Sequence, residues 1–591
     1  MRSLIGNLRY AGRQLRHSPG FAATVILTLA LCIGVNTAIF TVVDALFFRP
    51  LPYPYPERLV MLTTGFHKAG ASGVNTSQDG HEWELARDHA TLIEPAVYGS
   101  TSGVNLFAAG RAQYVQQQRI GAGFFHVLGV SPLVGREFTR QEDVPGGPAL
   151  TILSYGVWQR IFHGNPSIVG RTVDLKGAPY TVVGIMPRGF RAIDAQADLW
   201  TPLQPSAQGE GAGTNYGVVA RLKPGVTLAA ASDQLTAIMQ PYFKTRLGKN
   251  AAQVQLEERA IPLRSGLTYD LRSSVHLIWG AVILVLLIGC VNIAGILLAR
   301  SALRSREIAT RIALGASRGR VVAQLLAESV LLAFCGGLLG LLFGELALAG
   351  LLRLNPDEFT SWGAIHLDPY VIGIMLAVSL GTSIVFGLLP AIEATSIDIR
   401  SALSEAGRTA TRGRHWKRQG LVFAEVALGV VLVVSAGLLI RSFARLMNLN
   451  PGFNPNHVIT ASLSLQDARY STSQAGARLF RDTLQRIRQI PGVESAAAAL
   501  TAPYQRAVNL GVKTPETHGS RITNFSYVTP GFFKALGSPM LRGRAFTDAD
   551  NAQGAKVAIV NTDFVRRYLH NMPDPIGTPI QVAGDAYQVV G

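Results

Sequence analysis

The sequence predicts an α-helical membrane protein with large external domains of α+β structure, built on an internal tandem duplication. Three observations lead to this prediction. Only 15% of the 591 residues are charged and the mean hydropathy is +0.25, which favours a membrane protein over a soluble one. Long apolar stretches separate large polar regions, and motifs of the first large polar region recur in the second.

Five apolar stretches come close to or exceed the roughly 20 residues that a helix needs to cross the hydrocarbon core. They lie at residues 21–43, 277–299, 330–352, 371–389 and 421–440. The first follows a basic stretch and in this resembles a signal peptide, but its apolar run is too long and no small-residue cleavage site follows. We therefore expect it to be retained as a membrane anchor.

Basic residues collect in three segments beside these stretches. Residues 1–20 carry a charge of +4, residues 300–323 of +5 and residues 391–420 of +3, out of a total of +17. Since basic loops stay in the cytoplasm, the sequence predicts a multi-pass protein of the bacterial inner membrane with a cytoplasmic N-terminus. The cytoplasmic parts are then 1–20, an elbow at 300–329 and a linker at 390–420. The positive net charge is therefore explained by the orientation of the chain in the membrane, and nucleic acid is not an expected partner.

The external regions are then 44–276, a short loop at 353–370, and 441–591. Both large regions show strand-like alternation, as in Tyr180-Thr-Val-Val-Gly-Ile and Ala555-Lys-Val-Ala-Ile-Val. A duplication relates them: Gly123-Phe-Phe-His-Val-Leu-Gly recurs 408 residues later as Gly531-Phe-Phe-Lys-Ala-Leu-Gly. The second unit stops where the first continues, so we expect it to be truncated and the intact protein to carry eight helices.

No residue pattern predicts catalysis, a cofactor or a metal site. The three cysteines, Cys32, Cys290 and Cys335, all fall in apolar segments, where a thiol serves as a small apolar filler. His81 and His89 lack a metal-ligand spacing, and Asp79, Glu82 and Glu84 beside them are expected to form an exposed acidic turn. A phosphate-binding loop for ATP is also missing from the sequence, because the one Gly-Lys pair, Gly248-Lys249, is followed by Asn250.

Small and polar residues within the apolar stretches form a second group of candidates. Gly336, Gly340 and Gly344 recur every four residues, which predicts close packing against another helix, with a hinge as the alternative. Polar groups in a membrane need partners or water, and four such residues are Asn36, Asn292, Glu345 and Glu425. The two asparagines could bridge the first two helices. Glu345 is expected to form interhelical hydrogen bonds, with a proton or substrate path as the alternative, and Glu425 to reach the interface.

The elbow has the pattern of a short amphipathic helix. Residues 304–314 place Ile308 and Ile312 one turn apart, after which Gly315 can cap the helix and Ser317 can start the next one. Glu307 and Arg311 have the i, i+4 spacing of an ion pair. The pattern therefore predicts a rigid, basic elbow, either for coupling to a partner or as a solvated surface beside the lipid.

The residues around this elbow resemble a known family. Ala281-Val-Ile-Leu-Val-Leu-Leu-Ile-Gly-Cys-Val-Asn-Ile-Ala, Arg306-Glu-Ile-Ala-Thr-Arg-Ile-Ala-Leu-Gly-Ala-Ser and Gln324-Leu-Leu-Ala-Glu-Ser are similar to segments of MacB/FtsX-type permease subunits of ATP-binding-cassette (ABC) systems. Together with Gly34-Val-Asn-Thr-Ala-Ile-Phe, they most resemble the duplicated orphan permeases of Acidobacteria.

The resemblance implies MacB-like periplasmic core domains and a permease that moves them when a separate cytoplasmic ABC ATPase binds the elbow. The elbow residues that would couple the two are Arg306, Glu307, Arg311, Gly315, Ala316 and Ser317. Export or extraction of a substrate across the lipid bilayer would follow. The alternative is a membrane-anchored signalling or scaffold protein whose external domains regulate a periplasmic protein without transport.

Overall fold

The structure is a computed structural model. It describes residues 2–591 except 69–70, 109, 194–196, 208, 212, 249–253, 315, 355–364, 396–411, 506–507, 518–520 and 571. The side chains of Arg306 and Glu425 also lie outside the described part. The chain divides into two compact units, which are described separately. The first contains Met1–Gly103, Val115–Val173 and Tyr180–Arg441, and the second contains Val104–Tyr114, Asp174–Pro179 and Ser442–Gly591.

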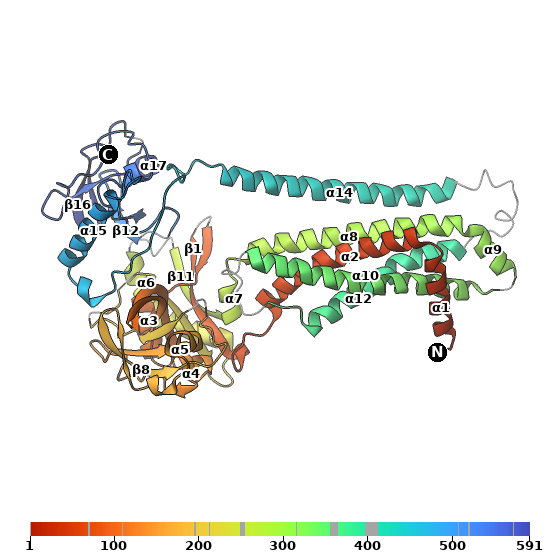
Figure 1. The fold of residues 1–591 in the computed structure, drawn as a ribbon, viewed down its shortest axis with the longest axis horizontal. Helices are drawn as coiled ribbons and strands as arrows, with labels where there is room; N and C mark the ends of the chain where they lie inside the picture. The colour runs from red at the N-terminus through yellow and green to blue at the C-terminus, as the bar shows by residue number, and fades with distance from the viewer. Residues whose placement is uncertain are drawn as a thin grey trace. The chain divides into compact units, whose positions relative to one another are not determined.

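Helices cover all five apolar stretches of the sequence (Figure 1). Four of them are long and apolar enough to cross a membrane, and the described part of a fifth, at Pro369–Val385, is shorter. The helices of this part of the chain are α1 (Arg2–Arg16), α2 (Pro19–Val43), α8 (Arg272–Leu303), α9 (Ser305–Ala313), α10 (Arg318–Leu354), α12 (Pro369–Thr395) and α14 (Arg412–Met447). Of the six basic residues at 391–420, Arg400 and Arg408 lie outside the described residues, and the other four lie at the start of α14, where the backbone alone is described.

Helices α2, α8, α10 and α12 pack into a bundle in which small residues allow close approach. A Cβ atom added to Gly336 would lie 2.5 Å from the Cβ of Leu29, and one added to Gly340 would lie 2.8 Å from the Cβ of Ile33. Gly344 faces α2 in the same way, at Thr37. On the other side of α10, the Ser379 and Ser383 hydroxyls of α12 donate hydrogen bonds to carbonyl oxygens of α10 at 2.9 and 2.8 Å. One face of α10 therefore contacts α2 and another contacts α12.

The α+β part of the first unit is built on an eleven-stranded sheet in the order β11-β1-β10-β3-β4-β9-β6-β8-β5, with β2 paired to β1 and β7 paired to β3 and β8. Its strands are β1 (Leu59–Lys68), β2 (Ala71–Asn75), β3 (Ile93–Ala108), β4 (Arg111–Ile120), β5 (Val134–Gly135), β6 (Leu150–Leu153), β7 (Thr172–Leu175), β8 (Ala178–Ile185), β9 (Leu199–Pro202), β10 (Tyr216–Leu222) and β11 (Val254–Pro262). Its helices are α3 (Gly80–His89), α4 (Phe124–Leu128), α5 (Tyr155–Phe162), α6 (Leu228–Leu247) and α7 (Leu263–Leu267).

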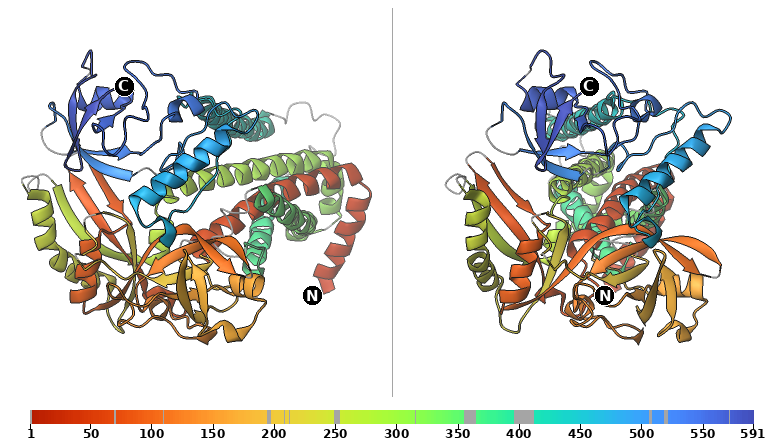
Figure 2. Two further views of the ribbon diagram at one scale, coloured as in Figure 1. Left: turned by 60° about the vertical axis from the view of Figure 1, so that its left-hand side comes forward. Right: turned by 90° about the vertical axis from the view of Figure 1, so that its left-hand side faces the viewer.

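Alternation along β1 divides the core of this domain between the two faces of the sheet. Leu59 and Met61 contact the cluster that includes Phe124 of α4, whereas Val60 and Leu62 contact the cluster that α3 and α6 cover. Helices α3 and α6 lie side by side over that face (Figure 2). Successive residues of a strand point to opposite faces, so a strand covered on both sides is apolar throughout.

The prediction of an exposed acidic turn at the start of α3 is wrong: Asp79 and Glu82 are buried and Glu84 is half-buried. Asp79 and Glu82 are fully buried, because they form a reciprocal cap in which each side chain accepts a hydrogen bond from the backbone N–H of the other. Arg246 of α6 donates to Asp79 at 2.7 Å and to Glu82 at 3.0 Å. The equally buried Glu258 of β11 accepts a hydrogen bond from Thr64. Among the described residues, two of these three buried carboxylates pair with Arg246, whereas no ion pair is given for Glu258.

This acidic cluster predicts that the first unit loses stability as the pH rises. Burial and the charge of Asp79 raise the pKa of Glu82 to about 7, and burial raises the pKa of Glu258 well above its ordinary value. Above about pH 4.5 the unfolded chain releases these protons while the folded chain keeps them, so the free energy of unfolding falls between pH 4.5 and 7. Thermal unfolding of the purified full chain across this pH range measures the slope.

The substitution Glu258→Gln keeps the size of the side chain and removes the buried ionisable group. We expect it to flatten the pH slope and to raise stability at pH 8 by roughly 1–3 kcal/mol, the cost of a poorly satisfied buried polar group. Glu257→Gln is the matched control, since the neighbouring Glu257 is partly exposed and paired with His67 and Arg259. An unchanged slope in Glu258→Gln would contradict the prediction.

The second unit has a five-stranded sheet in the order β13-β12-β15-β16-β14. Its elements are α15 (Ser473–Arg488), β12 (Val508–Lys513), β13 (Arg521–Phe525), α16 (Phe532–Ala535), β14 (Val557–Ala558), α17 (Thr562–Tyr568), β15 (Pro579–Val582) and β16 (Asp585–Val589). Buried residues of four of these strands form its core, including Val512, Ala558, Ile580 and Val589.

The two units repeat the same local geometry at a second duplicated motif, Gly135-Arg-Glu-Phe-Thr and Gly543-Arg-Ala-Phe-Thr, whose copies are also 408 residues apart. Gly135 and Gly543 both have positive φ, +81° and +72°, and a Cβ atom at either would strike a carbonyl oxygen of the neighbouring chain segment. The next residue in each unit, Arg136 or Arg544, donates its backbone N–H at 2.9 Å to that carbonyl and forms an ion pair six residues on. Only glycine fits such a position at low cost, which explains why the motif keeps it in both copies.

Candidate coupling site

The elbow forms a separate short helix, α9, between the long helices α8 and α10. Arg304 lies at its N-cap and Leu314 at its C-cap. Beyond the cap, the Ala316 N–H donates to the Arg311 carbonyl at 3.0 Å. A bond between residues five apart is one of the two that close a helix in a Schellman cap. Ser317 follows, and its carbonyl accepts the N–H groups of the first turn of α10.

Apolar side chains hold α9 against the start of α10. Ile308 and Val321 are buried, and Ile312, Ala316 and Leu325 pack around them. This small core uses the two isoleucines that the helical spacing pairs. It fixes the angle between α9 and α10, since a buried cluster resists changes in the position of its members.

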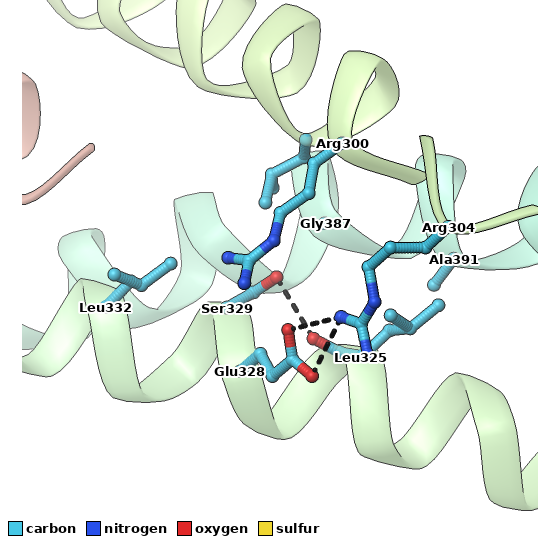
Figure 3. A pocket seen from close by; sticks show the side chains of 9 residues that line it. Arg300, Arg304, Leu325, Glu328, Ser329, Leu332, Gly387 and Ala391 are labelled. Carbon is cyan, nitrogen blue, oxygen red and sulfur yellow. Dashed lines mark hydrogen bonds and ion pairs between the residues drawn. The ribbon is translucent and has the colours of Figure 1, made fainter. Parts of the chain in front are cut away.

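An ion pair joins the elbow to the bundle at Arg304 (Figure 3). The Arg304 guanidinium donates to both carboxylate oxygens of Glu328 on α10, at 3.0 and 3.2 Å, and to Glu307 on α9 at 3.0 Å. The side chains of Arg304 and Glu328 are only 12% and 6% exposed. The hydrogen bonds from Arg304 also hold the pKa of Glu307 below its ordinary value, so that Glu307 is ionised at neutral pH. Arg304 therefore links α9 to α10 through two charge-assisted contacts.

A small cavity of about 30 Å³ lies beside this ion pair, lined by Leu297, Arg300, Arg304, Leu325, Glu328, Ser329, Leu332, Gly387 and Ala391. Its walls come from α8, α10 and α12. A cavity of this size holds a water molecule and excludes an organic substrate. The surroundings of the Arg304 pair therefore serve to join helices.

A second set of contacts joins α9 to the N-terminal helix. Arg311 pairs with Glu307 at the predicted i, i+4 spacing, donates to Gln324 of α10 at 3.2 Å, and donates to the hydroxyl of Tyr10 on α1. Its guanidinium also lies 5.3 Å from the centre of the Tyr10 ring, within the range of a cation–π contact. Arg311 thus links α9 to the next helix, α10, and to α1, which lies 301 residues earlier at Tyr10.

The tip of the elbow is exposed, in contrast to its base. Leu314 exposes 83% of its surface, and Ser317, Arg318 and Arg320 beside it are exposed as well. An exposed leucine among cations is the kind of surface that a protein partner can bury. Of the other elbow residues named from the sequence, Gly315 and the side chain of Arg306 lie outside the described residues.

The polar residues of the apolar stretches occupy different environments. Asn36 is buried, and its amide donates to the Cys32 carbonyl of its own helix at 2.7 Å, while its Oδ1 has no partner among the described residues. The structure gives no hydrogen bond between Asn36 and Asn292, which is half-buried. The amide group of Asn36 is directed along α2, so it does not reach across to α8. Glu345 is exposed on α10, and the Glu425 side chain is not described.

Sequence reasoning did not identify the residues that fix the elbow. Arg304 meets Glu328, and Arg311 meets Tyr10, only in the folded chain. The first two residues are 24 positions apart in the sequence and the second two are 301 positions apart. One signal was available for Glu328: a carboxylate beside an otherwise apolar stretch needs a partner.

Comparison with known proteins gives consistent results along the chain. Residues 22–238 and 372–591 match the family model of the MacB-like periplasmic core domain, and residues 279–399 match that of the FtsX-like permease C-terminal region. The macrolide export ATP-binding/permease protein MacB of Chromobacterium violaceum is 27% identical over 295 residues, which cover 48% of this chain and 42% of that protein. The MacB protein of Neisseria meningitidis serogroup B is 24% identical over 345 residues, 56% of this chain and 51% of that protein.

The chain therefore spans about half the length of the curated relatives it matches. Among solved structures, the periplasmic region of MacB from Actinobacillus actinomycetemcomitans aligns with 37% of this chain and 92% of its own length, at 15% identity and a TM-score of 0.26. The two segments that match the periplasmic core domain make up most of the sequence, and the FtsX-like segment contains the elbow. This chain belongs to the MacB/FtsX-type family of ABC-transporter permeases.

Proposed function

We propose that this permease transmits motion from a separate cytoplasmic ATPase to its external domains through the elbow α9. The observation that carries this proposal is the contrast between the base and the tip of the elbow. The base is tied to α10 by the buried Arg304–Glu328 pair and to α1 by Arg311, whereas the tip around Leu314 is exposed. A force applied at such a tip moves the bundle, because charge pairs and a packed core connect the two.

The proposed orientation places α1 and α9 in the cytoplasm of a bacterial cell and both α+β domains in the periplasm. The basic residues at 1–20 and 300–323 support it through the positive-inside rule. Helices α2, α8, α10, α12 and α14 would then be five crossings of the inner membrane. The loop at 353–370 would lie on the periplasmic side.

The proposed activity is export or extraction of an apolar or amphipathic substrate. The relatives named above are macrolide exporters by name, which supports this class of substrate. The cavity at the elbow is too small to hold such a molecule, so the proposal assigns substrate contact to the external domains.

The test is co-purification of the full chain with an ATPase from its native membranes in a mild detergent. The variant Leu314→Asp places a charge on the exposed tip without disturbing a packed residue, and we expect it to lose the ATPase and the ATP hydrolysis that depends on it. Leu354→Asp is the matched control, since Leu354 is 84% exposed at the other end of α10.

Retention of the ATPase by Leu314→Asp would contradict coupling through the tip. A wild-type preparation that binds no ATPase would favour a scaffold that regulates a periplasmic partner. Export assays with a panel of dyes, antibiotics and lipopeptides then separate a transporter from that scaffold.

A further inference from the structure

The N-terminal helix α1 runs crosswise to α2 at the end of the bundle that carries α9 (Figure 1). The chain turns between Arg16 and Pro19, where Ser18 donates to the Gln14 carbonyl and accepts a hydrogen bond from Arg300 of α8 at 2.9 Å. The apolar helix α2 begins directly after this turn. Because α2 is long and apolar enough to cross a membrane, α1 would lie near the lipid head groups and along the membrane plane in the orientation proposed above.

One face of α1 contacts the rest of the unit. Ala11 is fully buried, Leu15 packs against the cluster of Val25, Leu29 and Leu332, and Tyr10 accepts the hydrogen bond from Arg311 of the elbow. These three residues hold α1 in place and connect it directly to α9.

The opposite face of α1 carries a basic stripe. Arg9, Arg13 and Arg16 are all exposed, and their spacing of four and three residues places them on one line along the helix. None of them forms an ion pair with the described residues, and α1 contains no acidic residue. The stripe is therefore an uncompensated row of three guanidinium groups at head-group depth.

We propose that this stripe binds the phosphate groups of anionic lipids and that lipid binding positions the elbow through the Tyr10–Arg311 contact. Guanidinium groups match phosphate oxygens in charge and in the geometry of paired hydrogen bonds. Each basic residue near an anionic membrane surface adds to binding, and three on one face act together. Lipid composition would thus regulate the coupling step. This regulation rests on the proposed function, whereas binding of lipid to the stripe is independent of it.

The experiment uses the purified full chain in nanodiscs of phosphatidylcholine with or without phosphatidylglycerol, and no ATPase. Phosphatidylglycerol retained by the protein is measured by native mass spectrometry, and the order of α9 by hydrogen exchange of its amides. We expect the wild type to retain phosphatidylglycerol selectively and α9 to exchange more slowly when it is present. The triple variant Arg9→Gln, Arg13→Gln, Arg16→Gln should lower selective retention by at least about tenfold.

Two controls separate the steps. The first control is a triple variant of α15, Arg478→Gln, Arg481→Gln, Arg486→Gln. It removes the same charge from exposed positions and should leave lipid retention unchanged. Tyr10→Phe keeps the stripe and removes the hydroxyl that Arg311 contacts, so it should retain the lipid but lose its effect on α9 exchange.

Equal retention by the wild type and the triple variant would overturn the proposal. So would a triple variant that retains the lipid in nanodiscs but loses the ATPase in the co-purification described above, because the stripe would then be a protein-binding surface. Since lipid retention and exchange are measured without an ATPase, a failure of the proposed coupling function leaves these two results interpretable.

Discussion

Replacement of Gly336 by leucine is expected to prevent α2 from packing on α10. A Cβ atom at this position would lie 2.5 Å from the Cβ of Leu29 and 3.3 Å from the carbonyl oxygen of Ile26, so the two helices would have to separate. Overpacking at a tight contact costs roughly 1–3 kcal/mol or more, and here it would also weaken the neighbouring contacts of Gly340 and Gly344. We expect a large fall in the melting temperature of the detergent-solubilised protein and loss of a monodisperse peak in size-exclusion chromatography.

The same substitution elsewhere on α10 provides the control. Gly350 has no atom within 4 Å of an added Cβ, so Gly350→Leu should leave both measurements near those of the wild type. A wild-type melting temperature for Gly336→Leu would mean that α2 and α10 do not meet at this glycine. Gly336→Ala adds the Cβ alone and should fall between the two leucine variants.

Removal of Arg304 is expected to destabilise the elbow strongly. Glu328, which is 6% exposed, would lose the only ion pair that the structure gives it among the described residues. Truncating one partner of a buried pair costs about 3–5 kcal/mol, because the remaining charge stays buried without compensation. Thermal unfolding of Arg304→Ala, and faster hydrogen exchange in α9, measure this effect.

A double variant distinguishes the ion pair from a loss of packing. Arg304→Ala with Glu328→Gln removes the buried charge as well, and we expect it to recover most of the stability. ATP-dependent function should stay impaired, since the charged contact between α9 and α10 is lost. Arg320→Ala is the matched single control, because Arg320 is an exposed arginine at the start of α10, the helix that follows α9. If the double variant were as unstable as Arg304→Ala, the contribution of Arg304 would be packing of its aliphatic part.

Local patterns were sufficient for the secondary structure of the membrane part. The apolar stretches became helices, and Ile308 and Ile312 lie on the buried face of α9, because both predictions depend only on residues close in sequence. The duplication could also be seen in the sequence. Gly135 and Gly543 have the same backbone conformation, which only glycine adopts at low cost, so the motif around them is kept in both copies.

The burial of Asp79 and Glu82 was not predictable in the same way. Both are acidic residues in a polar segment, and their sequence fits an exposed turn as well as a buried cap. The position of Arg246, 164 residues beyond Glu82, decides between these outcomes.

The sequence by itself determined the membrane helices, the basic segments beside them, the repeated α+β domains and the amphipathic elbow, since these depend on composition and on periods of two or 3.6 residues. The tertiary structure alone decided that α2 is the helix that packs on the glycine face of α10, that Glu328 pairs with Arg304, and that Tyr10 contacts Arg311. Such contacts join residues distant along the chain. They depend on how whole helix faces fit together, and no local pattern specifies that fit.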